Sequence, residues 1–227
     1  MNKPFIVACI PAFNEEKTIA SVVVKAMRHV DKVIVCDDGS TDLTREIAEK
    51  LGAKVIAHER NMGYGSALNS LFNEAGVEDA EIIVTLDADG QHNPDDIPRV
   101  IEPILRGEAD IVIGSRFLDE SGKQIPRYRE VGVKTITKLA NKASYSELTD
   151  AQSGFRAYSR KALEKLKPSE MGMGASTEIL VKAYENGFRV KEVPVKIKYE
   201  GETSSQNPVS HGLEVVMSTV KHLSIRR

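Results

Sequence analysis

Tryptophan is absent from the chain, cysteine occurs only twice, and aromatic residues make up 5% of the 227 residues. The two cysteines, Cys9 and Cys36, are too few for the disulfide framework of a small secreted protein. Both lie in apolar segments, where buried thiols usually act as small apolar side chains. One disulfide between them stays open if these segments form neighbouring strands. The cysteine content therefore favours a cytoplasmic protein.

The sequence also lacks an excess of charge of either sign and a long apolar run. Its 31 basic and 33 acidic residues give a formal net charge of −2, so no bulk attraction to nucleic acid is expected. No segment approaches the roughly 20 apolar residues that span a bilayer. The first residues lack the basic start and apolar region of a signal peptide. We expect a protein that does not cross a membrane by itself but can lie against one.

Two common phosphate-binding motifs are missing as well. No Gly-x-x-x-x-Gly-Lys-Ser/Thr sequence occurs, which excludes a P-loop phosphotransferase. Gly63-Tyr64-Gly65 precedes a predicted helix, but it follows the third predicted strand and lacks the last glycine of a dinucleotide fingerprint. A nicotinamide enzyme is therefore disfavoured.

Strands and helices alternate over residues 5–114, which predicts an α/β fold with a mostly parallel sheet flanked by helices. Strands are predicted at residues 5–10, 33–36, 54–57, 82–86 and 111–113, and Pro11 is expected to interrupt the first. Helices are predicted after Asn14 and at residues 41–51, 66–75 and 95–106. After Arg116 the pattern predicts helices at 131–143, 178–186 and 212–223, the last amphipathic, and a strand at 193–199. The 41% hydrophobic content suits one compact domain.

Carboxylates directly follow two of the predicted strands. Asp87-Ala88-Asp89-Gly90-Gln91-His92 comes after residues 82–86, and Asp37-Asp38-Gly39-Ser40 comes after residues 33–36. Open α/β sheets bind ligands beyond the carboxyl ends of their strands, and hard oxygen ligands suit a divalent cation. The pattern predicts a metal-bound phosphate site. The simpler alternative for the first run is a solvated turn before the next helix.

Five ordered motifs resemble those of glycosyltransferase family 2, and within it the dolichyl-phosphate mannose/glucose synthase branch. They are Pro11-Ala12-Phe13-Asn14-Glu15-Glu16, Asp37-Asp38-Gly39-Ser40-Thr41-Asp42, Asn61-Met62-Gly63, Asp87-Ala88-Asp89-Gly90-Gln91-His92 and Gly114-Ser115-Arg116. Ser153-Gly154-Phe155-Arg156 and Glu192-Val193-Pro194 extend the resemblance to nearly the whole chain.

The resemblance implies a single GT-A catalytic domain. Residues 1–116 would bind the nucleotide sugar, and residues 117–227 would form the smaller acceptor side. The implied reaction is a metal-dependent, inverting transfer of a hexose from a nucleotide-diphosphate sugar to polyprenyl or dolichyl phosphate. GDP-mannose and UDP-glucose both stay open as donors.

Roles for single residues also follow from the resemblance. Asp89 and Gln91 would hold Mg²⁺ or Mn²⁺, because a nucleoside diphosphate leaves poorly until a cation neutralises its charge. The catalytic residues would be Asp87, Asp89 and Arg116. The nucleotide-sugar pocket would be lined by Pro11, Ala12, Asn14, Glu15, Asp37, Asp38, Asn61, Gly63 and Asp87. Simpler roles are a helix cap for Asp38 and a turn for Asn61.

The acceptor is inferred from a missing carboxylate. Many members of the wider family that glycosylate hydroxyl groups carry a Glu-Asp pair where this chain has Ser176-Thr177-Glu178-Ile179-Leu180. Ile179 cannot act as the general base that a hydroxyl needs, whereas a phosphate acceptor is already charged. A shift of one residue would instead make Glu178 the base. Arg127, Arg129 and Arg156 are expected to bind the acceptor phosphate.

Lys134, Lys138 and Lys142 share one face of the predicted helix at 131–143, which suits contact with an anionic membrane surface. Peripheral contact at the cytosolic face is therefore expected, with a solvated helix face as the simpler reading. Segment 199–205 lacks two cations that relatives carry, which leaves the exact acceptor open. The alternatives are a family 2 enzyme with a hydroxyl acceptor on a glycan or protein, and a catalytically silent nucleotide-sugar-binding protein. Many relatives continue into transmembrane helices, so a truncated form of a longer protein also stays open.

Overall fold

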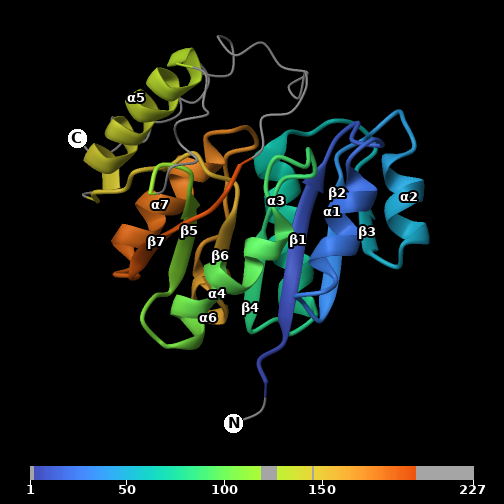
Figure 1. Ribbon diagram of the computed structural model, residues 1–227, viewed down its shortest axis with the longest axis horizontal. Helices are drawn as coiled ribbons and strands as arrows, with labels where there is room; N and C mark the ends of the chain where they lie inside the picture. Colours follow the sequence, from blue (N-terminus) through green and yellow to red (C-terminus); the bar gives the residue numbers. More distant parts are fainter. Residues whose placement is uncertain (1–2, 119–126, 145, 198–227) are drawn as a thin grey trace.

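The computed structural model describes residues 3–118, 127–144 and 146–197. These residues form a sheet with the strand order β3-β2-β1-β4-β6-β5-β7 (Figure 1). The strands are β1 (Ile6–Ala12), β2 (Lys32–Asp37), β3 (Lys54–Ala57), β4 (Ile82–Thr85), β5 (Ile111–Ser115), β6 (Arg156–Ser159) and β7 (Val190–Pro194). All pairs are parallel except those of β6, which runs antiparallel to both β4 and β5.

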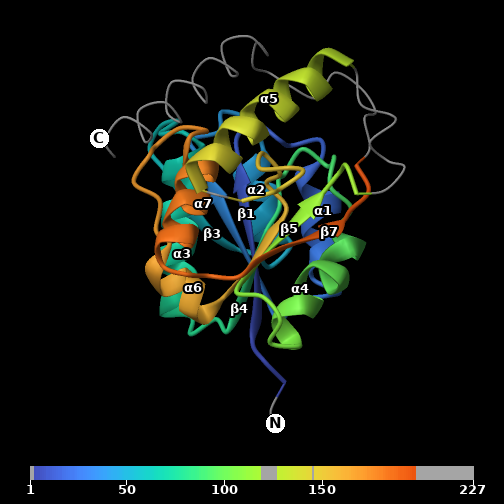
Figure 2. The same cartoon turned by 90° about the vertical axis from the view of Figure 1, so that its left-hand side faces the viewer.

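Helices cover both faces of this sheet, as Figure 2 shows. They are α1 (Ile19–Ala26), α2 (Thr44–Lys50), α3 (Tyr64–Val77), the 3₁₀ turn η1 (Pro94–Asp96), α4 (Ile97–Leu105), α5 (Arg127–Ser144), α6 (Arg160–Lys165) and α7 (Ala175–Glu185). One face packs against α1, α2 and α4, and the other against α3, α6 and α7. Helix α5 packs on α7 outside these layers. The arrangement confirms the predicted α/β fold.

Two hydrophobic cores, one on each face of the sheet, follow from the alternation of side chains along β1. Ile6, Ala8 and Ile10 belong to one core, whereas Val7 and Cys9 belong to the other. Successive side chains of a strand point to opposite faces, so a strand covered on both faces is apolar throughout. The continuous apolar sequence of β1 therefore indicates a strand that is covered on both faces of the sheet.

Pro11 does not interrupt β1, contrary to the prediction. The strand continues to Ala12, and Pro11 pairs with Cys36 of β2. Strand β4 pairs with β1 only as far as Cys9, so one side of β1 has no strand neighbour at Pro11. A proline has no N–H to donate and is tolerated where a strand lacks a partner on one side.

The second half of the chain differs more from the prediction. Strand β7 lies earlier than the predicted strand at 193–199, because it pairs in register with β5 from Val190 to Pro194. Ile197 instead forms an isolated antiparallel bridge with His92. Strand β6 and helix α6 were not predicted. The predicted helix at 212–223 and the polar segments at 119–124 and 200–208 lie outside the described residues. No helix in the described part of the chain is both long and apolar enough to span a membrane.

Candidate active site

Acidic side chains gather at the carboxyl ends of β1, β2 and β4. These strands are parallel neighbours, so their ends lie at the same edge of the sheet. Glu15 lies beyond β1, Asp37 ends β2, and Asp87 and Asp89 lie beyond β4. Residues that are far apart in the sequence are brought to the place where open α/β sheets bind ligands.

Asp87 sits against the backbone of Gly154. A Cβ atom on Gly154 would lie 2.6 Å from each carboxylate oxygen of Asp87, so only glycine fits there. Burial raises the pKa of Asp87 to about 6, and the positive charges of Arg116 and Arg156 act in the opposite direction. The carboxylate is thus held in a tight and partly desolvated position.

Asp89 and Glu15 complete an acidic cluster with Asp87. Burial raises the pKa of Asp89, and the charge of Asp87 raises it further. Burial also raises the pKa of Glu15; a hydrogen bond from Thr18 opposes this rise, while the charges of Asp89, Asp42 and Asp87 add to it. Like charges held together are relieved by a proton or by a cation.

The donors of this cluster fit a hard divalent cation. Oδ1 of Asp89 accepts a hydrogen bond from the backbone N–H of Gln91 at 2.9 Å, so both side chains belong to one tight turn. Within the described residues, no group of three His, Cys, Asp or Glu side chains is already arranged around one metal position. Mg²⁺ usually takes one or two carboxylates and completes its shell with water and substrate phosphates. Asp89 and Gln91 suit a cation whose other ligands come from a diphosphate.

Asp38 is bound by backbone N–H groups of the loop that precedes α3. Its two oxygens accept the backbone N–H groups of Met62 at 2.9 Å and Gly63 at 2.8 Å. Nδ1 of His58 lies 2.6 Å from Oδ1 of Asp38, whose residue exposure is 4%. These bonds differ from the helix cap that was the alternative role of Asp38, and its contact with the base or ribose, like that of Asp37, stays a prediction. Asp38 holds the loop that precedes α3.

Asp37 lines a hollow of about 470 Å³ beside α2 and the end of β3. Oδ1 of Asp37 accepts a hydrogen bond from the backbone N–H of Ser40 at 3.2 Å. Arg45 and Glu59 border the same hollow. Its position at the strand ends is compatible with a nucleotide, and the nucleotide contact of Asp37 stays a prediction.

Asn14 joins the loop after β1 to the loop after β2. Its backbone is left-handed, with φ of 56°, a conformation that asparagine tolerates better than most residues. Its N–H donates to Oγ of Ser40 at 2.9 Å, and its Oδ1 accepts the N–H of Thr41 at 2.9 Å. The C=O of Ala12, which follows Pro11 at the end of β1, accepts the N–H of Asp38 at 2.8 Å. These bonds set the shape of the predicted nucleotide pocket.

Gly63, the last residue of the Asn61-Met62-Gly63 motif, lies where two backbone segments come close together. Its φ is 96°, and a Cβ atom there would lie 2.6 Å from the C=O of Met171. The same C=O accepts the N–H of Gly65 at 2.7 Å. The role of Gly63 is thus to let the loop before α3 dock on the segment before α7, and contact of Asn61 with a nucleotide stays a prediction.

Arg116 is fixed by two acidic residues that sequence reasoning missed. Its Nε donates to Oδ2 of Asp150 at 2.5 Å, and Asp150 is fully buried. The N–H groups of Asp150 and Thr149 donate to Glu192 at 2.9 Å and 2.8 Å. This chain of bonds places a cation near enough to Asp87 to oppose the rise that burial causes in the pKa of that carboxyl. Glu192 is part of a quoted motif, but nothing in the sequence pairs it with Asp150.

Arg156 is not available to an acceptor phosphate in this structure. It is 2% exposed, and its nitrogens donate to the backbone C=O groups of Ala151, Ser153 and Ser176 at 2.7, 2.8 and 3.1 Å. We therefore remove Arg156 from the acceptor site. Arg127 and Arg129 lie at the start of α5, and their side chains are outside the described part of the structure.

Glu178 and Ile179 are both engaged inside the fold. Ile179 is fully buried in the core between the sheet and α7, so it does not stand where a base would act. Glu178 accepts the N–H groups of Ser169 at 2.9 Å and Glu170 at 2.8 Å, and it pairs with Lys182 at 2.7 Å. The choice of Ile179 as the position of the missing base is thus corrected, and Glu178 is committed to a structural role.

Glu178→Gln is expected to lower stability at neutral pH and to spare sugar transfer. Burial alone would raise the pKa of Glu178, but Lys182, Ser169 and Glu170 together hold it below its ordinary value. A carboxyl with a lowered pKa stabilises the fold above its unfolded pKa, near 4.3, and loses this effect as the pH falls through its folded pKa. Urea unfolding should show a deficit of about 1–3 kcal/mol at pH 7 that shrinks below about pH 4. A loss of kcat without this deficit would identify Glu178 as a base.

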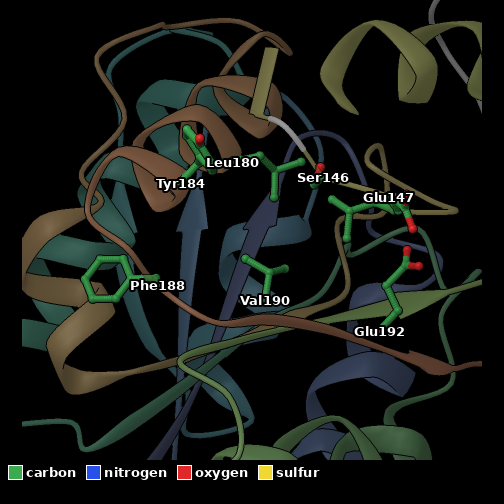
Figure 3. A pocket seen from close by; sticks show the side chains of 8 residues that line it. Ser146, Glu147, Leu180, Tyr184, Phe188, Val190 and Glu192 are labelled. Carbon is green, nitrogen blue, oxygen red and sulfur yellow. The ribbon is translucent and has the colours of Figure 1, made fainter. Parts of the chain in front are cut away.

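A separate hollow of about 390 Å³ lies between α7 and β7. Figure 3 shows Leu180 and Tyr184 on its α7 side and Phe188, Val190 and Glu192 along the segment that includes β7. In the sheet, β4, next to β1, is separated from β7 by β6 and β5. None of the acidic cluster at the ends of β1, β2 and β4 lines this hollow.

Comparison with known proteins supports the identification made from the motifs. The model of the family described as Glycosyl transferase family 2 matches residues 7–167. UDP-N-acetylglucosamine–dolichyl-phosphate N-acetylglucosaminyltransferase of Methanococcus voltae is 37% identical, over 88% of each chain. Dolichyl-phosphate hexose transferase of Haloferax volcanii is 32% identical, over 92% of this chain and 90% of that one.

A solved structure shows the same architecture. The crystal structure of glucosyl-3-phosphoglycerate synthase from Mycobacterium tuberculosis, in complex with Mn²⁺ and uridine-diphosphate-glucose, superposes with a TM-score of 0.73. The match covers 96% of this chain and 79% of that chain at 23% identity. It confirms the predicted GT-A fold.

Proposed function

Because the chain belongs to glycosyltransferase family 2 and is thus a glycosyltransferase, we propose that it moves a hexose from a nucleotide-diphosphate sugar to polyprenyl phosphate. The observation that carries this proposal is the acidic cluster of Glu15, Asp87 and Asp89 at the strand ends. The names of two relatives, which describe dolichyl-phosphate transferases, support the acceptor.

The start of α7 also favours a phosphate acceptor. In the described part of the chain, the one acidic side chain in its first turn is Glu178, and that carboxylate binds the backbone of residues 169 and 170. A hydroxyl acceptor needs a base, whereas a phosphate monoester carries about −1.5 to −2 charge and needs none. The geometry therefore supports a phosphate acceptor, whose charged oxygen can act as the nucleophile without a base.

In the proposed reaction an acceptor phosphate oxygen forms a bond to the anomeric carbon of the hexose. The bond from that carbon to the nucleoside diphosphate breaks, and a single displacement inverts the configuration. Asp89 and Gln91 would hold a divalent cation, which when bound would neutralise the charge on the departing diphosphate. Asp87 orients the donor, and Arg116, fixed by Asp150, supplies positive charge beside it.

A transfer assay with matched acceptors tests this function. Polyprenyl phosphate and polyprenol differ only in the phosphate, and each is offered with GDP-mannose, UDP-glucose or UDP-N-acetylglucosamine in the presence of Mn²⁺. We expect a sugar-phosphate-polyprenol product with one of these donors and no transfer to polyprenol. Equal transfer to polyprenol would indicate a hydroxyl acceptor. Binding of donors without transfer or release of sugar would indicate a silent binding protein.

Helix α5 is proposed to contact the membrane that holds the lipid. Ile136 and Ala140 are buried on its inner side toward α7, whereas Lys134, Lys138 and Lys142 are exposed on the outer side. Figure 1 shows the helix along the outside of the molecule next to α7. An exposed basic face on a packed helix suits the anionic surface of a membrane.

Replacing Lys134, Lys138 and Lys142 together with glutamine should weaken binding to anionic liposomes. Each cation near such a surface contributes about 1 kcal/mol, so cosedimentation should fall strongly while donor binding in solution is unchanged. The matched control replaces the exposed Lys50, Lys165 and Lys191, which removes the same charge from other elements. Equal effects of the two triple variants would contradict a membrane role for α5.

A further inference from the structure

His92 is a buried imidazole whose two ring nitrogens have no hydrogen-bond partner among the described residues. Its side chain is 4% exposed. Buried polar groups are nearly always paired, and leaving one unpaired lowers stability. An unpaired imidazole at the end of the Asp87–His92 motif therefore points to a partner that it meets during function.

Among the described residues, the carboxylate that lies within 4 Å of a ring nitrogen of His92 is that of Asp87. Nδ1 of His92 lies 3.5 Å from Oδ2 of Asp87, about half an ångström beyond an ordinary hydrogen bond. Catalytic hydrogen bonds are often long in a ligand-free enzyme and tighten in the substrate complex. A small movement of the carboxylate is enough to form the bond.

The surroundings hold the ring facing that carboxylate. It packs against Phe155 with ring centroids 5.3 Å apart, and the backbone of His92 bridges to Ile197. Gly154, the neighbour of Phe155, leaves the space that both oxygens of Asp87 occupy, since a Cβ atom there would lie 2.6 Å from each. The same short segment thus supports the imidazole and the carboxylate together.

We propose that His92 is a positioning residue for Asp87 and donates its Nδ1–H to that carboxylate when the nucleotide sugar binds. The inference rests on the proposed function, because that function places Asp87 at the donor. The bond fixes the orientation of the carboxylate, as partners behind the ligands of metal sites do. His92 acts through Asp87 and does not itself touch the donor.

Three substitutions of His92 distinguish the role of Nδ1 from that of Nε2. Asparagine places an amide N–H near the position of Nδ1, glutamine places one near Nε2, and phenylalanine supplies an aromatic ring without nitrogen. His92→Phe and His92→Gln should lower kcat by about 10- to 100-fold, whereas His92→Asn should stay within a few-fold of the wild type. The melting temperature of His92→Phe should be unchanged or higher, because two unpaired polar atoms are removed.

A binding measurement provides a readout besides activity. Mn²⁺ is titrated in the presence of UDP or GDP and followed by electron paramagnetic resonance. The apparent affinity should fall about tenfold in His92→Phe and remain close to the wild type in His92→Asn, because the charge of Asp87 acts on Asp89 and a misoriented carboxylate would add less to the attraction of the cation.

Wild-type kcat and Mn²⁺ affinity in His92→Phe would overturn the role of His92. So would equal losses in the asparagine and glutamine variants together with a lower melting temperature, because that pattern indicates packing. A wild-type protein that neither binds Mn²⁺ with a nucleotide nor transfers sugar would overturn the proposed function itself.

Discussion

Asp89→Ala is expected to abolish sugar transfer and leave the fold intact. Asp89 lies in the turn beyond β4, where its Oδ1 accepts the N–H of Gln91 at 2.9 Å. The substitution removes a charged oxygen donor from a strand end and no packing from either core, so unfolding should change little. Transfer should fall by about 10³-fold or more if the charge on the leaving diphosphate is no longer neutralised.

The measurement compares initial rates with and without a chelator. Removal of divalent cations should reduce the wild type to the level of the variant, and added Mn²⁺ should restore only the wild type. Asp95→Ala is the matched control, because Asp95 is exposed and pairs with His29 away from the cluster. Full transfer by Asp89→Ala with Mn²⁺ present would contradict its role as a metal ligand.

Local patterns were enough to predict the parallel strands in the first half of the chain. Residues 54–57 match β3, and the predicted strands at 33–36 and 82–86 match β2 and β4 to within one residue at each end. Apolar runs that are buried on both faces mark such strands clearly. Strand β6 was missed because its four residues carry little pattern, and its place between β4 and β5 depends on pairing with residues far away in the sequence.

The carboxylates of the site were predictable because each directly follows an apolar strand. The residues that support the site were not predictable, since they come from distant segments of the chain. Asp38 supports Gly63, and Asp150 links Arg116 to Glu192. A motif identifies residues that share a region, whereas contacts with distant segments decide which of them are already bound by the protein. Asp38 and Arg156 belong to recognisable motifs, and backbone groups of other segments occupy the hydrogen-bonding atoms of both side chains.

Ile179 also shows that a motif does not fix the role of a single residue. The absence of a base was inferred at this position, and the fold buries Ile179 in the core between the sheet and α7. The conclusion about the acceptor now rests on Glu178, whose oxygens are used by Ser169, Glu170 and Lys182. The chemistry inferred from the sequence is retained, but a different residue carries it.

Arg156→Met is expected to destabilise the protein by at least about 3 kcal/mol, because the C=O groups of Ala151, Ser153 and Ser176 lose their donors in a buried place. Each buried group left unpaired costs about 1–3 kcal/mol, and methionine fills most of the volume without replacing any donor. The melting temperature should fall by roughly 6 °C or more, since a domain of this size shifts by about 2–4 °C per kcal/mol.

The control for this variant is Arg160→Met, which removes an exposed guanidinium paired with Asp79 and should change stability by less than about 1 kcal/mol. Both variants are compared by urea unfolding and by the KM for polyprenyl phosphate of the folded protein. A phosphate ligand and a structural arginine give opposite results. If Arg156→Met kept its stability and raised only the KM for the acceptor, the guanidinium would have to leave its three C=O partners to bind phosphate. Loss of stability with an unchanged KM instead places Arg156 in the scaffold that holds Gly154 against Asp87.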